Sequence, residues 1–266
     1  MAVALKTRKT EGGMRVPPMI GVHGMSGVGK TTLGASAPKP IFIQTEQGEG
    51  LLQIDTFDFG KEGIATEYGE VTEAIDALIA NEHDYQTLVI DSLDHLEPLM
   101  HDHLCKQNNA PTMDKGPFGY GAGYVAAANE WRVLMKKLNE LRSHKNMAVI
   151  LIAHSQHRKM DEPGQTQYDR WDLKLHAKSA SVITETVDCL LYAKHQVKMR
   201  KEDKGFGAVK AIGIDTGERV LVAEGGPHVN AKNRYNLPAE FPLSWQAFEQ
   251  ALTQSIKPAK KETANG

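Results

Sequence analysis

The sequence is poor in cysteine, in long apolar runs and in net charge. Its 266 residues contain two cysteines, Cys105 and Cys189, which lie far apart and form no C-x-x-C pair. This spacing excludes a disulfide scaffold and a cysteine zinc cluster, and it favours a reducing compartment. No apolar run approaches the roughly 20 residues that a membrane-spanning helix needs, and the N-terminus lacks the apolar stretch of a secretion signal. We therefore expect a cytoplasmic protein without a membrane partner.

The composition predicts one globular unit. The net charge of −2 gives no global attraction to nucleic acid, so a nucleic-acid site would have to be a local patch. Hydrophobic residues make up 41% and charged residues 24%, which is ordinary for a folded domain of this length. We expect a flexible polar arm over residues 1–16, one folded core over 17–254 and a disordered tail over 255–266.

The order of apolar runs predicts an α/β fold. Strands are expected at 18–23, 41–45, 87–90, 148–153 and 187–193, and helices at 71–80, from 93 onward, around 131–141 and at about 244–252. Nearly continuous apolar strands alternating with helices indicate a mainly parallel twisted sheet with helices on both faces. Asp215-Thr216-Gly217 is a turn signal that predicts a late antiparallel hairpin at one edge.

A phosphate-binding loop follows the first expected strand. Its sequence matches G-x-x-x-x-G-K-[ST] in full, with a helix expected after it: Gly24-Met25-Ser26-Gly27-Val28-Gly29-Lys30-Thr31. Glycines let backbone N–H groups wrap an anion, Lys30 reaches the β- and γ-phosphates, and Thr31 places its hydroxyl on Mg²⁺. Thr32 completes the expected nucleotide contacts. The motif predicts ATP and Mg²⁺ as ligands, and an ordinary glycine turn is the weaker alternative.

Asp91 ends the strand at 87–90, where a carboxylate faces the ligand crevice of an open sheet. We expect it to hold the magnesium through water. The alternative is that Asp91 or Ser92 caps the next helix, and both roles can coexist. Asp94 lies one helical turn further on and is expected to be solvated, as is the nearby group of histidines, His95, His101 and His103.

The order of these parts resembles the RecA-type core. It is most similar to the compact phage ATPases that have this core, the small RecA-like single-strand annealing and recombination proteins known as phage nucleotide-binding proteins with an AAA-type ATP-binding domain. The resemblance covers roughly residues 18–245 and begins with the glycine loop and Asp91. It implies a RecA-like P-loop ATPase that acts on single-stranded DNA as a homo-oligomer, either filament or ring. A single-strand DNA-binding protein is a further expected partner.

The resemblance assigns further residues to catalysis. A glutamate after the second strand orients the attacking water in RecA-like proteins, and Glu46 stands there, with Glu49 as a weaker substitute. Without the family, Glu46 reads equally well as a surface glutamate. A polar sensor of the γ-phosphate is implied just past the strand at 148–153, where either His154 or Gln156 fits.

Two basic residues are implied to act across a subunit boundary. Lys232 and Arg234 occupy the place from which RecA-like recombinases and ring helicases reach into the neighbouring ATP site. Their charge would stabilise the transition state of phosphoryl transfer, as an arginine finger does. The alternative is an exposed basic turn.

Two loops are implied to hold single-stranded DNA. The first, residues 108–124, carries Lys115, Phe118, Tyr120 and Tyr124 among glycines. The second, residues 155–178, interleaves basic and aromatic side chains, as phosphates and unstacked bases require. Its candidates are Arg158, Lys159, Tyr168, Arg170, Trp171, Lys174 and Lys178. Tyr168 and Trp171 have the alternative role of covering the sheet.

Other P-loop classes fit the sequence less well. The N-K-x-D motif of a GTPase and the S-G-G-Q signature of an ABC ATPase are absent. A nucleoside kinase would need a substrate lid. A ring-forming helicase-type motor remains an alternative, although the length leaves no room for an accessory domain, and an ATP-gated DNA-binding module with little hydrolysis is another.

Overall fold

The structure is a computed structural model, and it describes residues 16–48, 50, 52–60, 63–161, 164, 166–203 and 209–256, of which 198–203, 209–215 and 256 are described by their backbone alone. The predicted arm at 1–16 therefore lies almost entirely outside the described residues. The predicted tail at 255–266 does so from residue 257 onward, and its first two residues belong to the last helix.

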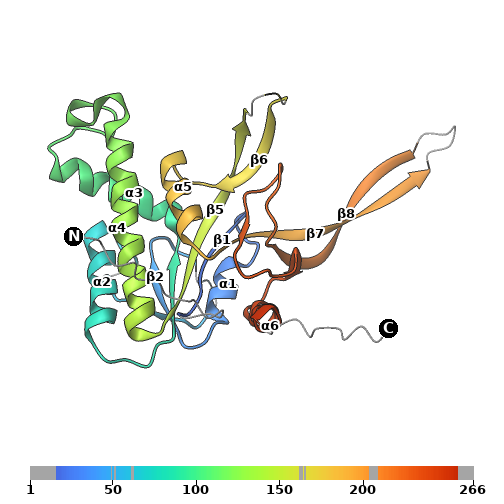
Figure 1. The fold of residues 1–266 in the computed structure, drawn as a ribbon, viewed down its shortest axis with the longest axis horizontal. Coiled ribbons are helices and arrows are strands. Elements are labelled where there is room, and N and C mark those ends of the chain that lie inside the picture. The colour runs from blue at the N-terminus through green and yellow to red at the C-terminus, as the bar shows by residue number, and fades with distance from the viewer. Residues whose placement is uncertain are drawn as a thin grey trace, which may run out of the picture.

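A single mixed sheet organises the chain (Figure 1). Its strands run in the order β10-β8-β7-β1-β5-β4-β2-β3, and the strands from β7 to β3 are parallel. Their bounds are β1 Met19–Gly24, β2 Pro40–Gln44, β3 Asp55–Thr56, β4 Thr87–Asp91, β5 Ala148–Met160, β7 Cys189–Asp203, β8 Val209–Val222 and β10 Glu240–Pro242. Two short antiparallel strands join this path, β6 Tyr168–Leu173 beside β5 and β9 Lys232–Asn233 beside β7. This arrangement confirms the predicted fold class.

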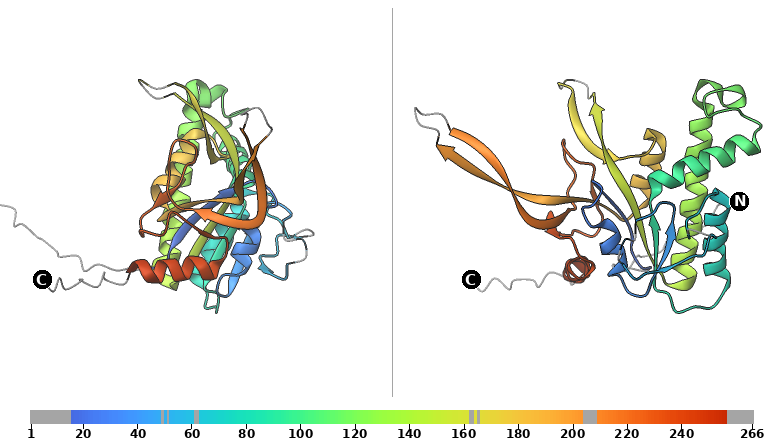
Figure 2. Two further views of the ribbon diagram at one scale, coloured as in Figure 1. Left: turned by 90° about the vertical axis from the view of Figure 1, so that its right-hand side faces the viewer. Right: turned by 180° about the vertical axis from the view of Figure 1, so that it is seen from behind.

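Helices cover both faces of the sheet. On one face lie α2 Tyr68–Ala80, α3 Leu93–Gln107, the 3₁₀ helix η1 Gly116–Gly121, α4 Ala122–Lys145 and α5 Ala177–Thr186, and on the other lie α1 Lys30–Ala35 and α6 Trp245–Ile256. Figure 2 shows these two groups on opposite sides of the strands. In β5, Val149 and Leu151 pack into the first core, whereas Ile150 and Ile152 pack into the second. Successive side chains of a strand point to opposite faces, which is why an unbroken apolar run is needed here.

The long hairpin β7–β8 projects away from the body of the molecule (Figures 1 and 2). The late hairpin is confirmed, but the predicted position of its turn is wrong. Residues 215–217 lie inside β8, where the pairing with β7 shifts register next to Gln196. Gly217 has φ +74° there, and Thr216 Oγ1 donates a hydrogen bond to Gln196 O over 3.0 Å. A turn-like Asp-Thr-Gly sequence can equally produce a β-bulge, because both need a left-handed glycine.

Neither expected DNA loop is a loop throughout. The segment after residue 154 continues β5 and pairs with β6, from Ser155 opposite Leu173 to Met160 opposite Tyr168. The first segment contains η1 and the start of α4. Within the described residues, no helix is long and apolar enough to span a bilayer.

Candidate nucleotide site

The site lies at one edge of the sheet, where four parallel strands end. The pairing places Gly24 of β1 beside His154 of β5, and Asp91 of β4 beside Gln44 of β2. The segments that follow these strands therefore meet at the carboxyl edge, where open α/β sheets bind ligands. A cavity of about 280 Å³ opens there.

The glycine loop forms one wall of this cavity. Gly27 and Gly29 have φ values of +76° and +104°, which a side chain would strain, so the loop turn depends on glycine at both positions. Lys30 is 6% exposed, and its Nζ donates to the carbonyls of Gly24 over 3.1 Å and Met25 over 3.0 Å. Burial lowers the pKa of Lys30, although nearby carboxylates, Asp91 first, oppose the shift. The ammonium group is thus held inside the loop, where a bound phosphate would be.

Thr31 and Asp91 meet at the base of the cavity. Thr31 Oγ1 donates to Asp91 Oδ2 over 2.6 Å, although the residues are 60 positions apart. Burial raises the pKa of Asp91, while the hydrogen bond from Thr31 opposes that rise. A hydroxyl and a buried carboxylate side by side are oxygen ligands of the kind Mg²⁺ takes together with phosphate oxygens and water. The residues present therefore fit the ion.

Glu46 lines the same cavity from the segment after β2. The ends of β2 and β4 are joined, because Thr45 Oγ1 donates to Ser92 O over 2.6 Å and accepts from Ser92 N over 2.9 Å. The Glu46 carboxylate lies 3.1 Å from His95 Nδ1 and 3.8 Å from His154 Nδ1. Two imidazoles thus hold one carboxylate beside the phosphate loop.

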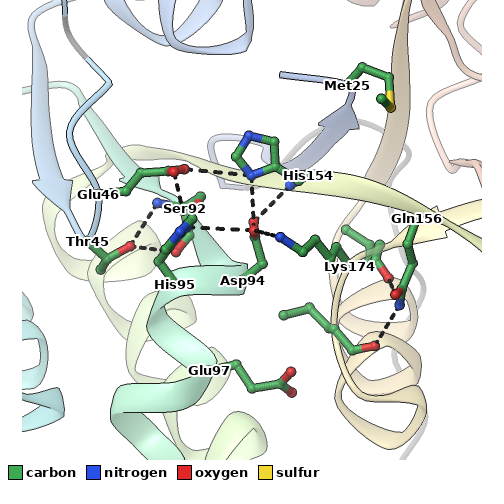
Figure 3. A network of polar contacts seen from close by, with 12 residues as sticks. Met25, Thr45, Glu46, Ser92, Asp94, His95, Glu97, His154, Gln156 and Lys174 are labelled. Atoms are coloured by element: carbon green, nitrogen blue, oxygen red, sulfur yellow. Dashed lines mark hydrogen bonds and ion pairs between the residues drawn. The ribbon is translucent and has the colours of Figure 1, made fainter. Parts of the chain in front are cut away.

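Asp94 is the buried centre of this network (Figure 3). Its side chain is 2% exposed, and it accepts from His154 N over 2.9 Å and from His154 Nδ1 over 3.0 Å. Burial alone would raise the pKa of Asp94, but the hydrogen bonds and charge of His154 outweigh it and leave the pKa below its usual range. The prediction that Asp94 is solvated is wrong, because the N-terminus of α3 faces the sheet edge, whereas His95 is exposed as predicted. Helical spacing alone does not show which turn faces the sheet.

The two candidates for the phosphate sensor, His154 and Gln156, lie in different places in the structure. His154 lines the cavity. Gln156 instead donates through Nε2 to the carbonyls of Leu173 over 3.0 Å and Leu175 over 3.2 Å, which ties β5 to the segment after β6. Of the two, only His154 faces the place of a phosphate.

Lys232 and Arg234 lie away from the cavity of their own chain. Lys232 Nζ donates to the carbonyls of Thr184 and Glu185, each over 2.7 Å, at the C-terminal end of α5. Arg234 donates to Glu185 O over 3.0 Å, and its side chain is 53% exposed. Neither residue lines the cavity. Both residues are held at the C-terminal end of α5, and Arg234, whose Nη1 also lies 3.6 Å from Asp188 Oδ1, is the more exposed of the two.

The second DNA candidate segment is a β-hairpin with an internal ion-pair cluster. Arg158 Nε lies 3.2 Å and Arg170 Nη2 lies 3.6 Å from Asp172 Oδ2, so both arginines share one buried carboxylate. Arg158 also donates to Leu175 O over 3.0 Å. Lys159 and Lys178 are exposed. Lys174 is exposed too, but its Nζ lies 3.6 Å from Asp94, which connects it to the Glu46 network.

The aromatic side chains expected to contact DNA differ in how deeply they are buried. Trp171 is half-buried, with its ring centre 3.6 Å from that of His157. Tyr168, at the far end of the hairpin, is also partly buried. In the first segment Phe118 is buried, so it cannot receive a base, whereas Tyr120 is fully exposed. Tyr124 stacks on His176 with ring centres 4.0 Å apart, so the two segments touch.

Sequence reasoning missed Arg219, which lines the cavity from β8. A lone arginine in a strand after a turn-like tripeptide carries no motif, and only the sheet order brings it near the glycine loop.

Comparison with known proteins gives a family match that includes the glycine loop. Residues 17–235 match the family model described as AAA domain. No curated protein matches the chain. Among solved structures, the crystal structure of the RadB recombinase is 15% identical, with 87% of this chain and 90% of that chain covered and a TM-score of 0.46.

Proposed function

The chain belongs to the AAA domain family, and from this premise we propose that it is a RecA-like, Mg²⁺-dependent ATPase that acts on single-stranded DNA. The observation that carries the catalytic part is the arrangement around one cavity. Lys30 lies in the glycine loop, Thr31 contacts Asp91 over 2.6 Å, and Glu46 faces them from the next strand. This is the set of groups that phosphoryl transfer to water requires.

Each residue has a separate task in the proposed hydrolysis. The loop N–H groups and Lys30 bind the phosphates, and Thr31 with Asp91 would hold the magnesium. When bound, Mg²⁺ neutralises charge that develops on the phosphate oxygens. Glu46 accepts a proton from the attacking water, and its contacts with His95 and His154 fix its carboxylate toward the cavity.

Two substitutions test this assignment. Lys30→Ala removes a charge from the bound phosphates, so ATP binding should weaken roughly 10- to 100-fold. Glu46→Gln keeps the shape but loses the base, so it should bind ATP normally and hydrolyse it about 10²- to 10⁴-fold more slowly. Fluorescent-nucleotide titration and phosphate release measure the two effects. Wild-type hydrolysis by Glu46→Gln would refute the role of Glu46.

The proposed DNA surface joins the hairpin β5–β6 to η1 and to the start of α5. Lys159 and Lys178 offer exposed charge, and Tyr120 and Trp171 offer accessible aromatic surface. The hairpin continues the strand that carries His154, so a change at the nucleotide has a direct path to it. We propose that this coupling serves phage recombination or single-strand annealing.

Binding to DNA can be tested separately from hydrolysis. Lys159→Ala combined with Lys178→Ala should weaken single-stranded DNA binding and flatten its salt dependence, by about 0.7 in the log–log slope per lost phosphate contact. The matched control is Lys136→Ala, which removes an exposed charge from the far half of α4. Equal salt slopes in all three proteins would remove Lys159 and Lys178 from the DNA site. ATPase stimulation by single-stranded DNA separates a motor from an ATP-gated binding module.

The proposed assembly depends on Arg234. Its exposed guanidinium is the candidate for reaching a neighbouring subunit's nucleotide, as a filament or ring would allow. Mixing Arg234→Ala with Lys30→Ala protein should then restore part of the ATPase, because mixed interfaces pair an intact loop with an intact arginine. No recovery at any mixing ratio would argue against a role in trans.

A further inference from the structure

Arg219 is the one arginine that lines the nucleotide cavity within the described part of the chain. It is exposed at the rim, and its guanidinium makes no hydrogen bond or ion pair with another described residue. The neighbouring acidic residue Glu240 is already engaged by Lys194 over 2.9 Å and by Gln196 over 3.3 Å. An unpaired guanidinium beside a buried ammonium is what a site for an anion requires.

The guanidinium lies against the glycine loop. A Cβ built on Gly29 would be 2.9 Å from Arg219 Nη1 and 3.6 Å from Leu243 Cδ2. Gly29 directly precedes Lys30, so the positive charge of Arg219 lies beside the phosphate cradle. Asp91 and Glu46 line the same cavity. The cavity therefore carries both cationic and acidic side chains.

The backbone of Arg219 is held on both edges of β8. The bulge at Thr216 and Gly217 immediately precedes it, and bulges beside active sites redirect the side chains that follow. On the other edge of β8, Leu243 N donates to Arg219 O over 2.9 Å, and Val220 pairs with Pro242. The strand thus holds a long, free side chain at a constant place over the loop.

We propose that Arg219 binds the polyphosphate of the nucleotide in cis, together with Lys30 of the same chain. This inference rests on the proposed nucleotide site and adds a second cationic contact to it. A guanidinium can also stack on a base, but the Arg219 side chain lies on Gly29 within the phosphate loop. The expected ligand is therefore the phosphate chain.

Binding of ATP and of inorganic tripolyphosphate distinguishes phosphate from base. Arg219→Ala should weaken both ligands by a similar factor, roughly 10- to 100-fold, as expected for charge-assisted hydrogen bonds. Arg219→Lys should recover part of the loss for both. Arg132→Ala, which removes an exposed arginine of α4, is the matched control and should bind like the wild type. A loss for ATP with unchanged tripolyphosphate binding would overturn the phosphate contact, and so would no loss for either ligand.

Subunit mixing tests whether the contact is made in cis. Lys30→Ala mixed with Arg219→Ala should show no ATPase beyond the sum of the separate proteins, because no chain then carries both residues. Recovery would place Arg219 in a neighbour's site and overturn the inference. Failure here is distinct from failure of the proposed function. If Lys30→Ala binds ATP like the wild type, the nucleotide site itself is wrong; if only the Arg219 variants are neutral, the site stands without this contact.

Discussion

Acidification should destabilise this protein through His23, the residue directly before the glycine loop. His23 is fully buried, with Nε2 2.8 Å from Asn230 O and Nδ1 2.9 Å from Ser155 Oγ. A carbonyl only accepts, so Nε2 carries the proton and Nδ1 accepts from the Ser155 hydroxyl. The neutral imidazole is therefore satisfied on both sides, and the charged form would have to exist without water.

The size of the effect follows from the pKa shift. Burial lowers the pKa of His23 from 6.5 to about 4, although the hydrogen bond to Asn230 opposes the shift. A base with a depressed folded-state pKa binds fewer protons folded than unfolded, so its contribution is intact above pH 6.5 and is lost between pH 6.5 and 4. Linkage gives a loss of about 2 kcal/mol at pH 5 and about 3 kcal/mol at pH 4.

Urea unfolding at a series of pH values measures this loss. His23→Gln keeps a donor for Asn230 O and cannot titrate, so its free energy of unfolding should fall about 3 kcal/mol less than that of the wild type between pH 7 and 4. His144→Gln, at an exposed position of α4, should follow the wild-type curve. Parallel curves for wild type and His23→Gln would refute the assignment of the buried neutral state.

Substitutions at three further positions test the packing of the core, an ion pair and the end of a helix. Trp131→Ala, at a position of 0% exposure in the core, should cost about 3–5 kcal/mol, and Trp131→Phe should cost much less because the indole N–H has no partner in the described residues; equal losses in thermal denaturation would contradict this. Arg142 donates to Asp188 over 2.5 Å and to Pro17 O over 2.7 Å, whereas Arg234 lies 3.6 Å from the same carboxylate; Arg142→Ala should therefore cost about 1–3 kcal/mol by removing the nearest cation of Asp188, which an unchanged urea midpoint would disprove. Lys232→Ala should cost about 1–2 kcal/mol through the C-terminal carbonyls of α5, and an unshifted melting curve would show that these hydrogen bonds are not stabilising.

The sequence by itself determined the parts that depend on neighbouring residues. The glycine loop needs its residue types at fixed spacing within one turn of chain, so Gly24 to Thr31 could be read directly. Continuous apolar runs predicted the interior strands, since each must bury both faces. Asp91 could be placed at the ligand edge because it directly follows such a strand, and ligands of open α/β sheets bind at the carboxyl ends of the strands.

Only the tertiary structure decided which distant polar groups meet. Asp94 and His154 lie 60 positions apart and are joined because β4 and β5 pair in one register. The segment after residue 154 became a hairpin because β6 pairs with it, which polar composition does not reveal. Arg219 reaches the glycine loop because the sheet places β8 next to β7 and β7 next to β1. Strand order and register are properties of the whole sheet, so no local pattern in the chain encodes these contacts.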